Sequence, residues 1–379
     1  MVGFVDDSTG QVNDFLQDQQ PDPKILLERM THDAQLWSDL LWLSGGLLEL
    51  SKCSYHFLYF DFQPDGTAMP RAGQVGPLLT VQDSQSKTPV PIPSKSVYCA
   101  HKTLGHYKAP AGNCMTQRIA LSTKANRLSQ QLATGPIHRD AAWTFYHSIY
   151  LPSIRYVLPH NFFSQDLLTQ LEAKPMGAIF AKCGYNRKTN QKLLYGPRSL
   201  GGQGFIRWYT LQGEGQIQLF IKFWRTQSQA STLLRVALAW VQYQSGRGLP
   251  ILTGVHTPLP YLTARWIPAL RTFLATINGQ IELDRNYIPA LQRHGDEYIM
   301  DKFVDSGAFT TLQLQQINRC RLYLDVSTVS DLTTANGKFI DTDTSKRPRT
   351  ILTSASLSPT TTPPPPPPPP RPPPPPPCR

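Results

Sequence analysis

The sequence predicts an α+β protein, and three patterns along its 379 residues support this class. Short apolar and β-branched runs, separated by turn-forming residues, fill much of residues 1–110. Apolar residues at helical spacing then recur within residues 111–243. The chain ends in a Ser/Thr-rich linker and a proline tract, and such a composition does not form a packed core.

We therefore expect four regions. Residues 1–110 form a mixed strand and helix region, residues 111–243 a mainly helical and basic region, residues 244–345 a small mixed region, and residues 346–379 a disordered tail. With 40% hydrophobic residues the chain can bury two or three cores. Because it has neither eighteen consecutive apolar residues nor a secretory signal pattern, we expect an intracellular protein of the nucleus or cytoplasm, neither secreted nor membrane-bound.

The first predicted element is a hairpin with two adjacent carboxylates. Gly3–Asp7 ends in Asp6 and Asp7, the turn-forming Ser8–Gly10 follow, and Val12–Phe15 form a second apolar stretch. Two carboxylates at a tight turn can bind Mg²⁺, a hard cation that prefers oxygen ligands. The same residues are also typical of an ordinary surface turn.

A helix follows the hairpin. Asp22 and Pro23 are a typical N-cap and first helical residue, so we expect a helix near residues 24–43 that ends at Gly45-Gly46. Its apolar residues keep to one face: Leu26, Met30, Ala34, Trp37 and Leu41. A β-rich run, Lys52–Phe60, and a strand-like stretch at Lys102–Gly105 come next.

The middle of the chain predicts three successive helices. The first covers residues 116–132, the second is capped by Asp140 and ends at Pro152, and the third begins at Ser164 and stops before Pro175. Three helices in this position fit a polymerase thumb by analogy, although any helical bundle has the same pattern.

Four further elements complete the folded part. A glycine-rich turn leads into a helix near Trp208, and Ser231–Gln242 is apolar nearly all round, which predicts a buried helix. Leu262–Ile277 and Leu312–Leu324 are the remaining helices. An acidic cluster between them is typical of a solvated face: Asp296, Glu297, Asp301 and Asp305.

The net charge of +11 is concentrated in the middle of the chain. Residues 100–225 contain 16 Lys and Arg against 4 Asp and Glu, whereas residues 1–99 contain 6 against 12. The basic residues interleave with Tyr185, Tyr195 and Trp208, which suits nucleic-acid binding, although a solvated basic face is the alternative. The candidate nucleic-acid-binding residues are Lys182, Arg187, Lys188, Lys192, Arg198 and Arg207.

The six cysteines lack paired C-x-x-C spacing, so we expect reduced thiols and no zinc site. Cys53 with His56, and Cys99 with His101, do not have the spacing of a zinc finger.

The order of these elements resembles the palm of reverse transcriptases encoded by non-LTR-type retrotransposons. In that family a Φ-x-D-D hairpin precedes a helix, an S-G-G turn, a strand with K-C and a strand with L-G. The corresponding residues here are Phe4–Asp7, residues 24–43, Ser44–Gly46, Lys52-Cys53 and Leu104-Gly105. The resemblance continues to about residue 345, through segments such as Tyr195–Pro197 and Gly201–Gly204.

The resemblance implies roles for five residues. Asp6 would be a metal ligand with Asp7 beside it in the same motif, and both are candidate catalytic residues with Lys52. Lys52 would lie near the phosphates of the incoming nucleotide, while Leu104 and Gly105 would belong to the strand that grips the primer end. The implied cofactor is Mg²⁺, and the implied partners are an RNA template, a DNA primer and deoxynucleotides.

The start of the chain departs from the family pattern. Family polymerases carry fingers and another catalytic aspartate well upstream of the hairpin, whereas Met1 lies just before Phe4 here. We therefore expect a truncated RNA-directed DNA polymerase, inactive alone. The alternatives are a non-catalytic nucleic-acid-binding remnant and an interaction protein whose proline tail docks on an SH3, WW or profilin-type groove.

Overall fold

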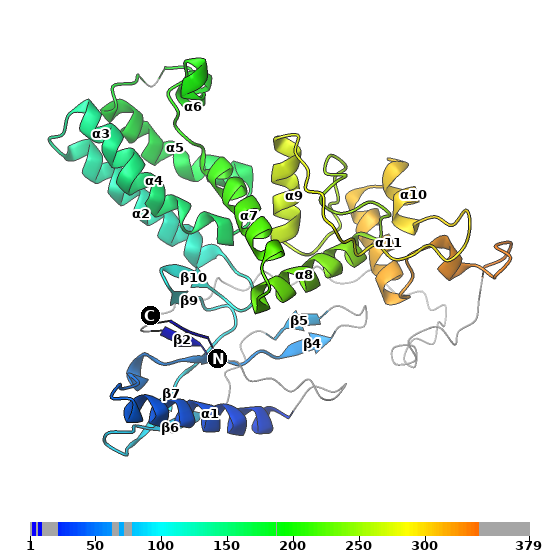
Figure 1. Ribbon diagram of the computed structural model, residues 1–379, viewed down its shortest axis with the longest axis horizontal. Helices are drawn as coiled ribbons and strands as arrows, with labels where there is room; N and C mark the ends of the chain where they lie inside the picture. Colours follow the sequence, from blue (N-terminus) through cyan, green and yellow to red (C-terminus); the bar gives the residue numbers. More distant parts are fainter. Residues whose placement is uncertain are drawn as a thin grey trace, which may run out of the picture. The chain divides into compact units, whose positions relative to one another are not determined.

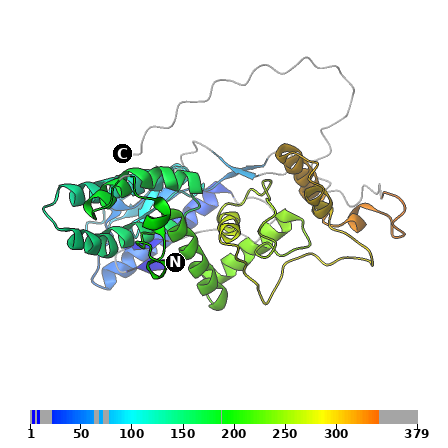
Figure 2. The same ribbon diagram turned by 90° about the horizontal axis from the view of Figure 1, so that it is seen from above.

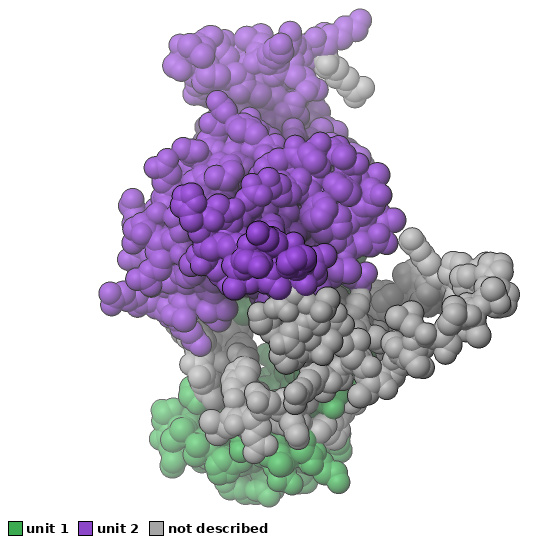
Figure 3. All heavy atoms as spheres, turned by 90° about the vertical axis from the view of Figure 1, so that its right-hand side faces the viewer, with its two compact units in different colours: residues 1–118, 360–379 green, residues 119–359 purple. Residues whose placement is uncertain are grey.

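The computed structural model is an α+β chain in which helices predominate and strands form small sheets. It describes residues 2–4, 7–9, 22–62, 68–71, 78–186 and 188–340. Of residues 2–4 and 7–9 it describes the backbone alone. The chain divides into two compact units, residues 1–118 with 360–379 and residues 119–359 (Figure 3). The proline tract lies outside the described residues.

Helix α1 (Pro23–Leu43) begins and ends as the sequence predicts. The side chain of Asp22 accepts a hydrogen bond from the Lys24 backbone N–H (2.9 Å) and so caps the first turn. At the other end Gly45 has a φ of +83°, and the Gly46 N–H donates to the Leu41 carbonyl at 2.8 Å. This left-handed turn ends the helix because glycine adopts positive φ without steric cost.

The remaining elements of the first unit are short. They are β1 (Val2–Phe4), β2 (Asp7–Thr9), the 3₁₀ helix η1 (Leu50–Lys52), β3 (Tyr55–His56), β4 (Phe60–Phe62), β5 (Ala68–Pro70), β6 (Leu79–Gln82), β7 (Pro89–Ile92), β8 (Ser94–Lys95), β9 (His101–Thr103) and β10 (His106–Lys108). Within the described residues each sheet has two strands; β3 and β8 pair in parallel, and the other pairs are antiparallel hairpins. The predicted β-rich run from Lys52 is therefore split between two sheets.

The core of the first unit lies between α1 and the β6–β7 hairpin, which run side by side in Figure 1. Leu79, Val81 and Ile92 are at most 5% exposed and pack against the apolar face of α1. The Gln82 N–H donates to the side chain of Gln35 on α1 at 2.7 Å. This bond satisfies an edge-strand donor and fixes the register of helix and hairpin.

The helices after residue 114 form most of the second unit. They are α2 (Met115–Thr134), α3 (Arg139–Phe145), the π turn η2 (Tyr146–Tyr150), α4 (Leu151–Arg155), η3 (Leu158–His160), α5 (Gln165–Lys182), α6 (Gln191–Tyr195), η4 (Arg198–Leu200), α7 (Trp208–Arg225), α8 (Gln229–Ser245), α9 (Trp266–Thr276), α10 (Ile299–Asp305), α11 (Thr311–Tyr323) and η5 (Val329–Leu332). Helices α3 and α5 lie side by side in both views (Figure 1) (Figure 2).

Two prolines that the sequence predicts to end helices do not end them. Pro152 is the second residue of α4, which continues directly from the π turn η2, so the helix passes through it. Pro175 lies inside α5, and beyond it Met176 and Ile179 are buried. Burial of each of these side chains is worth about 1.5–3 kcal/mol, which offsets the interior proline's cost of about 3 kcal/mol.

Helix α7 begins at Trp208 as predicted and contacts α4, α5, α8, α9 and η3. Two of its glycines allow neighbours to approach its backbone. A Cβ atom at Gly213 would lie 2.1 Å from the ring of Phe273 in α9, and one at Gly215 would lie 2.2 Å from Pro159 in η3. The glycines therefore set the distance between α7 and both neighbours.

Helix α8 confirms the predicted helix but not its burial. Leu238 and Val241 are buried, whereas Leu233, Val236 and Trp240 are 62%, 61% and 52% exposed. The buried face belongs to an apolar cluster with members on both sides of residue 243: Phe220, Leu238, Val241, Ile251, Leu252, Val255, Ile267, Leu270 and Leu274. These side chains pack α8 against α9 and the loop before it.

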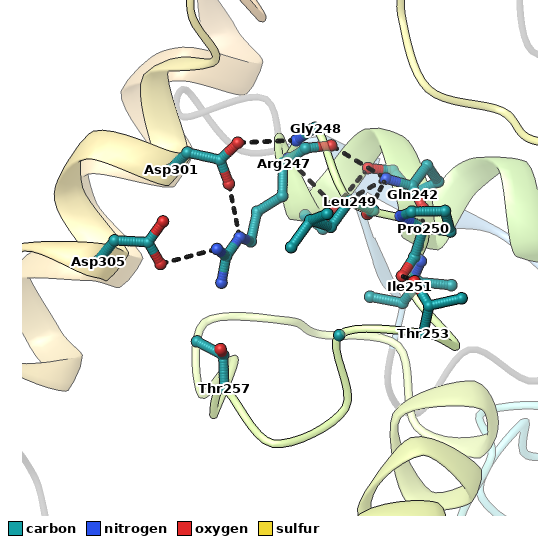
Figure 4. A network of polar contacts seen from close by, with 12 residues as sticks. Gln242, Arg247, Gly248, Leu249, Pro250, Ile251, Thr253, Thr257, Asp301 and Asp305 are labelled. Carbon is teal, nitrogen blue, oxygen red and sulfur yellow. Dashed lines mark hydrogen bonds and ion pairs between the residues drawn. The ribbon is translucent and has the colours of Figure 1, made fainter. Parts of the chain in front are cut away.

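The acidic cluster is more than a solvated face. Arg247, whose side chain is 6% exposed, donates to Asp301 (Nε to Oδ1, 2.6 Å) and to Asp305 (Nη2 to Oδ1, 2.7 Å), as Figure 4 shows. Asp296 is buried and accepts bonds from the backbone N–H groups of Gln292, Glu297 and Ser330. The cluster thus joins α10 to the loops around it.

Buried arginines also hold the loop between α8 and α9. The Arg271 guanidinium donates to the carbonyls of Ile251 (2.8 Å), Thr257 (2.6 Å) and Gly254. Burial, with a smaller contribution from the charge of Arg247, lowers the pKa of Arg271 to about 10. Helices α10 and α11 meet nearby around Met300 and Leu314, and α11 confirms the predicted helix.

Candidate nucleic-acid interface

A hairpin is present near the start of the chain, but its strands differ from those predicted, and the predicted second strand, Val12–Phe15, lies outside the described residues. Strands β1 and β2 pair antiparallel, with Val2 opposite Thr9 and Phe4 opposite Asp7. Ser8 and Thr9, which the sequence predicts to form the turn, instead belong to the second strand. Asp7 is its first residue, and Asp6 lies outside the described residues.

Lys52 precedes a strand rather than lying in one. It is the exposed last residue of η1, and the strand that follows begins at Tyr55. The Cys53 N–H donates to the Leu50 carbonyl at 3.1 Å, which closes the 3₁₀ turn. Lys52 is therefore placed on an exposed turn with its side chain accessible to solvent.

Leu104 and Gly105 form the two-residue connection of the β9–β10 hairpin rather than part of a strand. Thr103 pairs with His106, and both connecting residues have positive φ, 49° and 80°. A type I′ turn requires this combination, which Asn-Gly satisfies easily and leucine does not. Leu104 is also 47% exposed, so an apolar residue with a strained backbone lies at the tip of the hairpin.

No three His, Cys, Asp or Glu side chains in the described part of the chain lie close enough together to hold a metal ion. Cys53, Cys183 and Cys320 are free thiols as predicted, and Cys114 forms no disulfide. Cys99 is disulfide-bonded, contrary to the expectation of reduced thiols. None of the helices in the described ranges has the length and apolar character of a transmembrane span.

The predicted basic residues divide into internal and exposed groups. Lys182 donates from Nζ to the Gly135 carbonyl at 2.7 Å and so ties the end of α5 to the loop after α2. Lys188 and Lys192 are exposed, and Arg187 lies outside the described residues.

Arg207 belongs to a partly buried network at the start of α7. Its Nη1 donates to Oε1 of Glu172 at 2.7 Å, and its guanidinium lies 3.9 Å from the ring centroid of Tyr195. The other carboxylate oxygen of Glu172 accepts the Trp208 N–H at 2.8 Å. The Glu172 side chain is only 2% exposed, so Arg207 neutralises a buried charge, while Glu172 itself caps the first turn of α7.

Phe205 is the centre of an aromatic cluster behind the exposed basic surface. Its ring lies 4.5 Å from Trp143, 5.0 Å from Tyr146, 4.8 Å from Phe180 and 5.8 Å from Tyr185, measured between centroids. The hydroxyl of Tyr146 accepts the Ile206 N–H at 3.0 Å, and burial raises its pKa to about 12. This cluster fixes the rings that reach the surface.

Arg198 lies over the surface edge of this cluster. Its guanidinium is 5.0 Å from the ring centroid of Trp143, and its Nε donates to the Gln203 carbonyl at 3.3 Å. Arg139 is arranged similarly, 5.3 Å from the ring centroid of Tyr185 with Nη2 donating to the hydroxyl at 3.3 Å. Two guanidinium groups are thus held against two aromatic rings.

These groups surround an open hollow of about 400 Å³. We call it the Arg139–Arg198 hollow; it is lined by Arg139, Asp140, Trp143, Tyr185, Arg198, Gly202 and Gln203. The sequence pattern predicts Arg198 as a site residue but does not single out Arg139, Trp143 or Gln203. The sequence signals that point to them are the four-residue spacing of Arg139 and Trp143 on one helix face and the place of Gln203 in the glycine-rich segment Gly201–Gly204.

Comparisons of the chain with protein-family models, with curated proteins and with solved structures found no match.

Proposed function

We propose that the chain carries part of the palm of an RNA-directed DNA polymerase, which transfers deoxynucleotides to a primer 3′ end. The observation that carries this proposal is the register of the β1–β2 hairpin. Asp7 begins the second strand opposite Phe4, with Asp6 adjacent in the chain. A Φ-x-D-D sequence at a hairpin connection is the motif on which the resemblance to reverse transcriptases rests.

The strained turn at Leu104 gives independent support. A non-glycine residue at φ +49° costs free energy of order 1 kcal/mol, and an exposed leucine gains little from burial there. Residues in unfavourable backbone conformations cluster at ligand contacts, where function outweighs the cost. A role for Leu104 and Gly105 in holding a primer end would account for this residue type at the tip.

The donor chemistry of Asp6 and Asp7 fits magnesium. Carboxylate oxygens are preferred ligands, and two carboxylates with water and substrate phosphates suit the octahedral ion. Bound Mg²⁺ would stabilise the charge that develops on the transferred phosphoryl group. The chain itself would hold the ion through these carboxylates and position the primer end.

A metal titration combined with primer extension tests this function. We expect the full chain to bind Mn²⁺, followed by electron paramagnetic resonance, and the double variant Asp6→Asn, Asp7→Asn to lose that binding. Any Mg²⁺-dependent primer extension should fall at least about 100-fold in the same variant. Asp83→Asn, at an exposed turn between β6 and β7, is the matched control and should change neither result.

Unchanged Mn²⁺ binding in the double variant would contradict the proposal. The second candidate, nucleic-acid binding without chemistry, is favoured by the excess of basic residues between 100 and 225. It predicts salt-dependent binding of RNA or an RNA–DNA hybrid that the double variant retains, together with no extension under any metal condition.

A further inference from the structure

The Arg139–Arg198 hollow combines an opening to solvent with charged and aromatic side chains. It opens to solvent, and its volume falls within the range of about 300–1,000 Å³ that is typical of small-ligand sites. Its walls present two guanidinium groups, two aromatic rings and one side-chain amide. Phosphate oxygens are ligands for guanidinium, whereas planar bases stack on aromatic rings and on guanidinium planes.

The two arginine side chains are positioned before any ligand arrives. The stem of Arg198 passes over Gly204, where a Cβ atom would lie 3.1 Å from Cγ, and the stem of Arg139 passes over Gly184 at 3.3 Å. Both glycines have positive φ, 76° and 85°. These backbone turns leave space for the arginine stems, so the guanidinium groups lose less conformational entropy on binding.

The hollow also keeps hydrogen-bonding capacity. Gln203 accepts the Tyr185 hydroxyl through Oε1, which directs its NH₂ group away from that bond. Arg198 uses Nε for the Gln203 carbonyl. The pKa of the neighbouring His147 is lowered by burial and by the positive charge of Arg198, which indicates a local field that favours anions.

We propose that the Arg139–Arg198 hollow binds one unpaired nucleotide of a single-stranded nucleic acid. The phosphates lie against the two guanidinium groups, and the base lies against the aromatic and guanidinium surfaces with its edge near the Gln203 amide. A paired duplex is disfavoured because its base faces are covered by stacking and cannot enter a hollow of this size.

Asp140 gives the proposal a distinctive electrostatic signature. Its carboxylate lines the same hollow and is the only acidic group among the lining residues. It repels phosphate, so its removal should strengthen binding, while an arginine lost from the same wall should weaken it. If these residues only stabilised the fold, the two kinds of substitution would not change binding affinity in opposite directions.

The inference rests on the nucleic-acid part of the proposed function and not on its chemistry. The Asp6→Asn, Asp7→Asn variant should therefore keep this binding while losing metal. If the wild-type chain binds single strands at the hollow but binds no metal through Asp6 and Asp7, the polymerase proposal alone fails. The reverse result would remove the hollow as a nucleotide site and leave the polymerase proposal standing.

The test is a fluorescence anisotropy titration of the full-length chain with a labelled twelve-nucleotide oligo-dT and a labelled hairpin duplex, each at two salt concentrations. We expect Arg139→Ala, Arg198→Ala to weaken single-strand binding at least about tenfold and to reduce the salt slope by about one. Trp143→Ala removes a stacking surface and should weaken single-strand binding at least about fivefold, whereas Trp143→Phe, which keeps a ring, should weaken it less. Asp140→Asn should tighten binding about two- to threefold.

Two controls separate the hollow from general charge and aromatic content. Lys222→Ala on α7 and Trp240→Ala on α8 remove exposed residues outside the hollow and should leave the titration unchanged. Circular dichroism and the unfolding midpoint establish that each variant is folded. Equal affinity of wild type and the double arginine variant would overturn the proposal, as would tighter binding of the hairpin duplex than of oligo-dT.

Discussion

At the residue scale, two helical glycines have opposite surroundings and so predict opposite effects of alanine. Gly213 in α7 faces the ring of Phe273, and a Cβ atom there would overlap it at 2.1 Å. Gly177 in α5 has no atom within 4 Å of the corresponding position. Both lie inside helices, where alanine is otherwise favoured by about 1 kcal/mol.

We therefore expect Gly213→Ala to lower the free energy of unfolding by about 2–4 kcal/mol, because the overlap outweighs the gain in helix propensity. Gly177→Ala should raise it by about 0.5–1 kcal/mol. Urea unfolding followed by circular dichroism measures both. A neutral or stabilising result for Gly213→Ala would show that α7 and α9 do not approach as described.

Asp296 predicts a pH dependence of stability. Burial acts to raise its pKa, but hydrogen bonds from Ser330, Gln292 and Thr328 outweigh burial and lower the value from 3.8 to about 2. Since the folded pKa is below the unfolded one, the stabilisation is fully present above about pH 4 and is lost as the pH falls towards 2.

Asp296→Asn should lower the free energy of unfolding by about 1–3 kcal/mol at pH 6, because an amide NH₂ cannot accept the backbone donors. The difference from wild type should shrink at pH 3. Asp33→Asn, an exposed carboxylate on α1, is the control and should stay within about 0.5 kcal/mol of wild type. A difference that grows as the pH falls would contradict the assignment.

At the element scale, the Glu172–Arg207 pair joins α5 to the start of α7, and Gln191 of α6 accepts another bond from Arg207. Arg207→Met should lower the free energy of unfolding by about 3 kcal/mol, because it leaves the buried Glu172 carboxylate without its counter-charge. Lys192→Met, an exposed residue of α6, should change it by less than about 0.5 kcal/mol.

The same two variants distinguish a residue that stabilises the fold from one that contacts nucleic acid. Lys192→Met should reduce the salt dependence of nucleic-acid binding if this lysine contacts phosphate, whereas Arg207→Met, measured where it is folded, should not. A reduced salt slope in folded Arg207→Met would show that Arg207 contacts nucleic acid as well as Glu172.

The β9–β10 hairpin allows stability and function to be separated. Leu104→Gly relieves the positive φ and should raise the free energy of unfolding of the first unit by about 1 kcal/mol. If the leucine is retained for contact with a primer, the same substitution should reduce primer or hybrid affinity. Gly105→Ala, which adds strain at φ +80°, should act in the opposite direction on stability.

At the scale of the whole molecule, the two compact units predict two unfolding transitions. The first unit packs α1 on β6 and β7, and the second has separate apolar clusters around α8 and α11. In differential scanning calorimetry, Gly213→Ala should lower the midpoint of one transition and leave the other within about 1 °C. A single transition that shifts as a whole would contradict independent units.

Local signals in the sequence determined the positions of several helices and turns. Asp22-Pro23 and Gly45-Gly46 specify both ends of α1, because a cap and a positive-φ turn depend on the residues themselves. The apolar spacing of α2 and α11 was equally informative. A hairpin near Asp6 and Asp7 was predicted as well, but the strands that pair in it differ from the predicted ones.

Only the tertiary structure decided the rest. Helix α5 continues through Pro175 because the residues beyond it are buried, and one face of α8 stays exposed because its neighbours cover only the other. Likewise Arg207 is internal and Arg198 is at the surface, although both are basic residues in one segment. Caps and turns act between adjacent residues, whereas burial and the pairing of charges depend on residues distant in the chain.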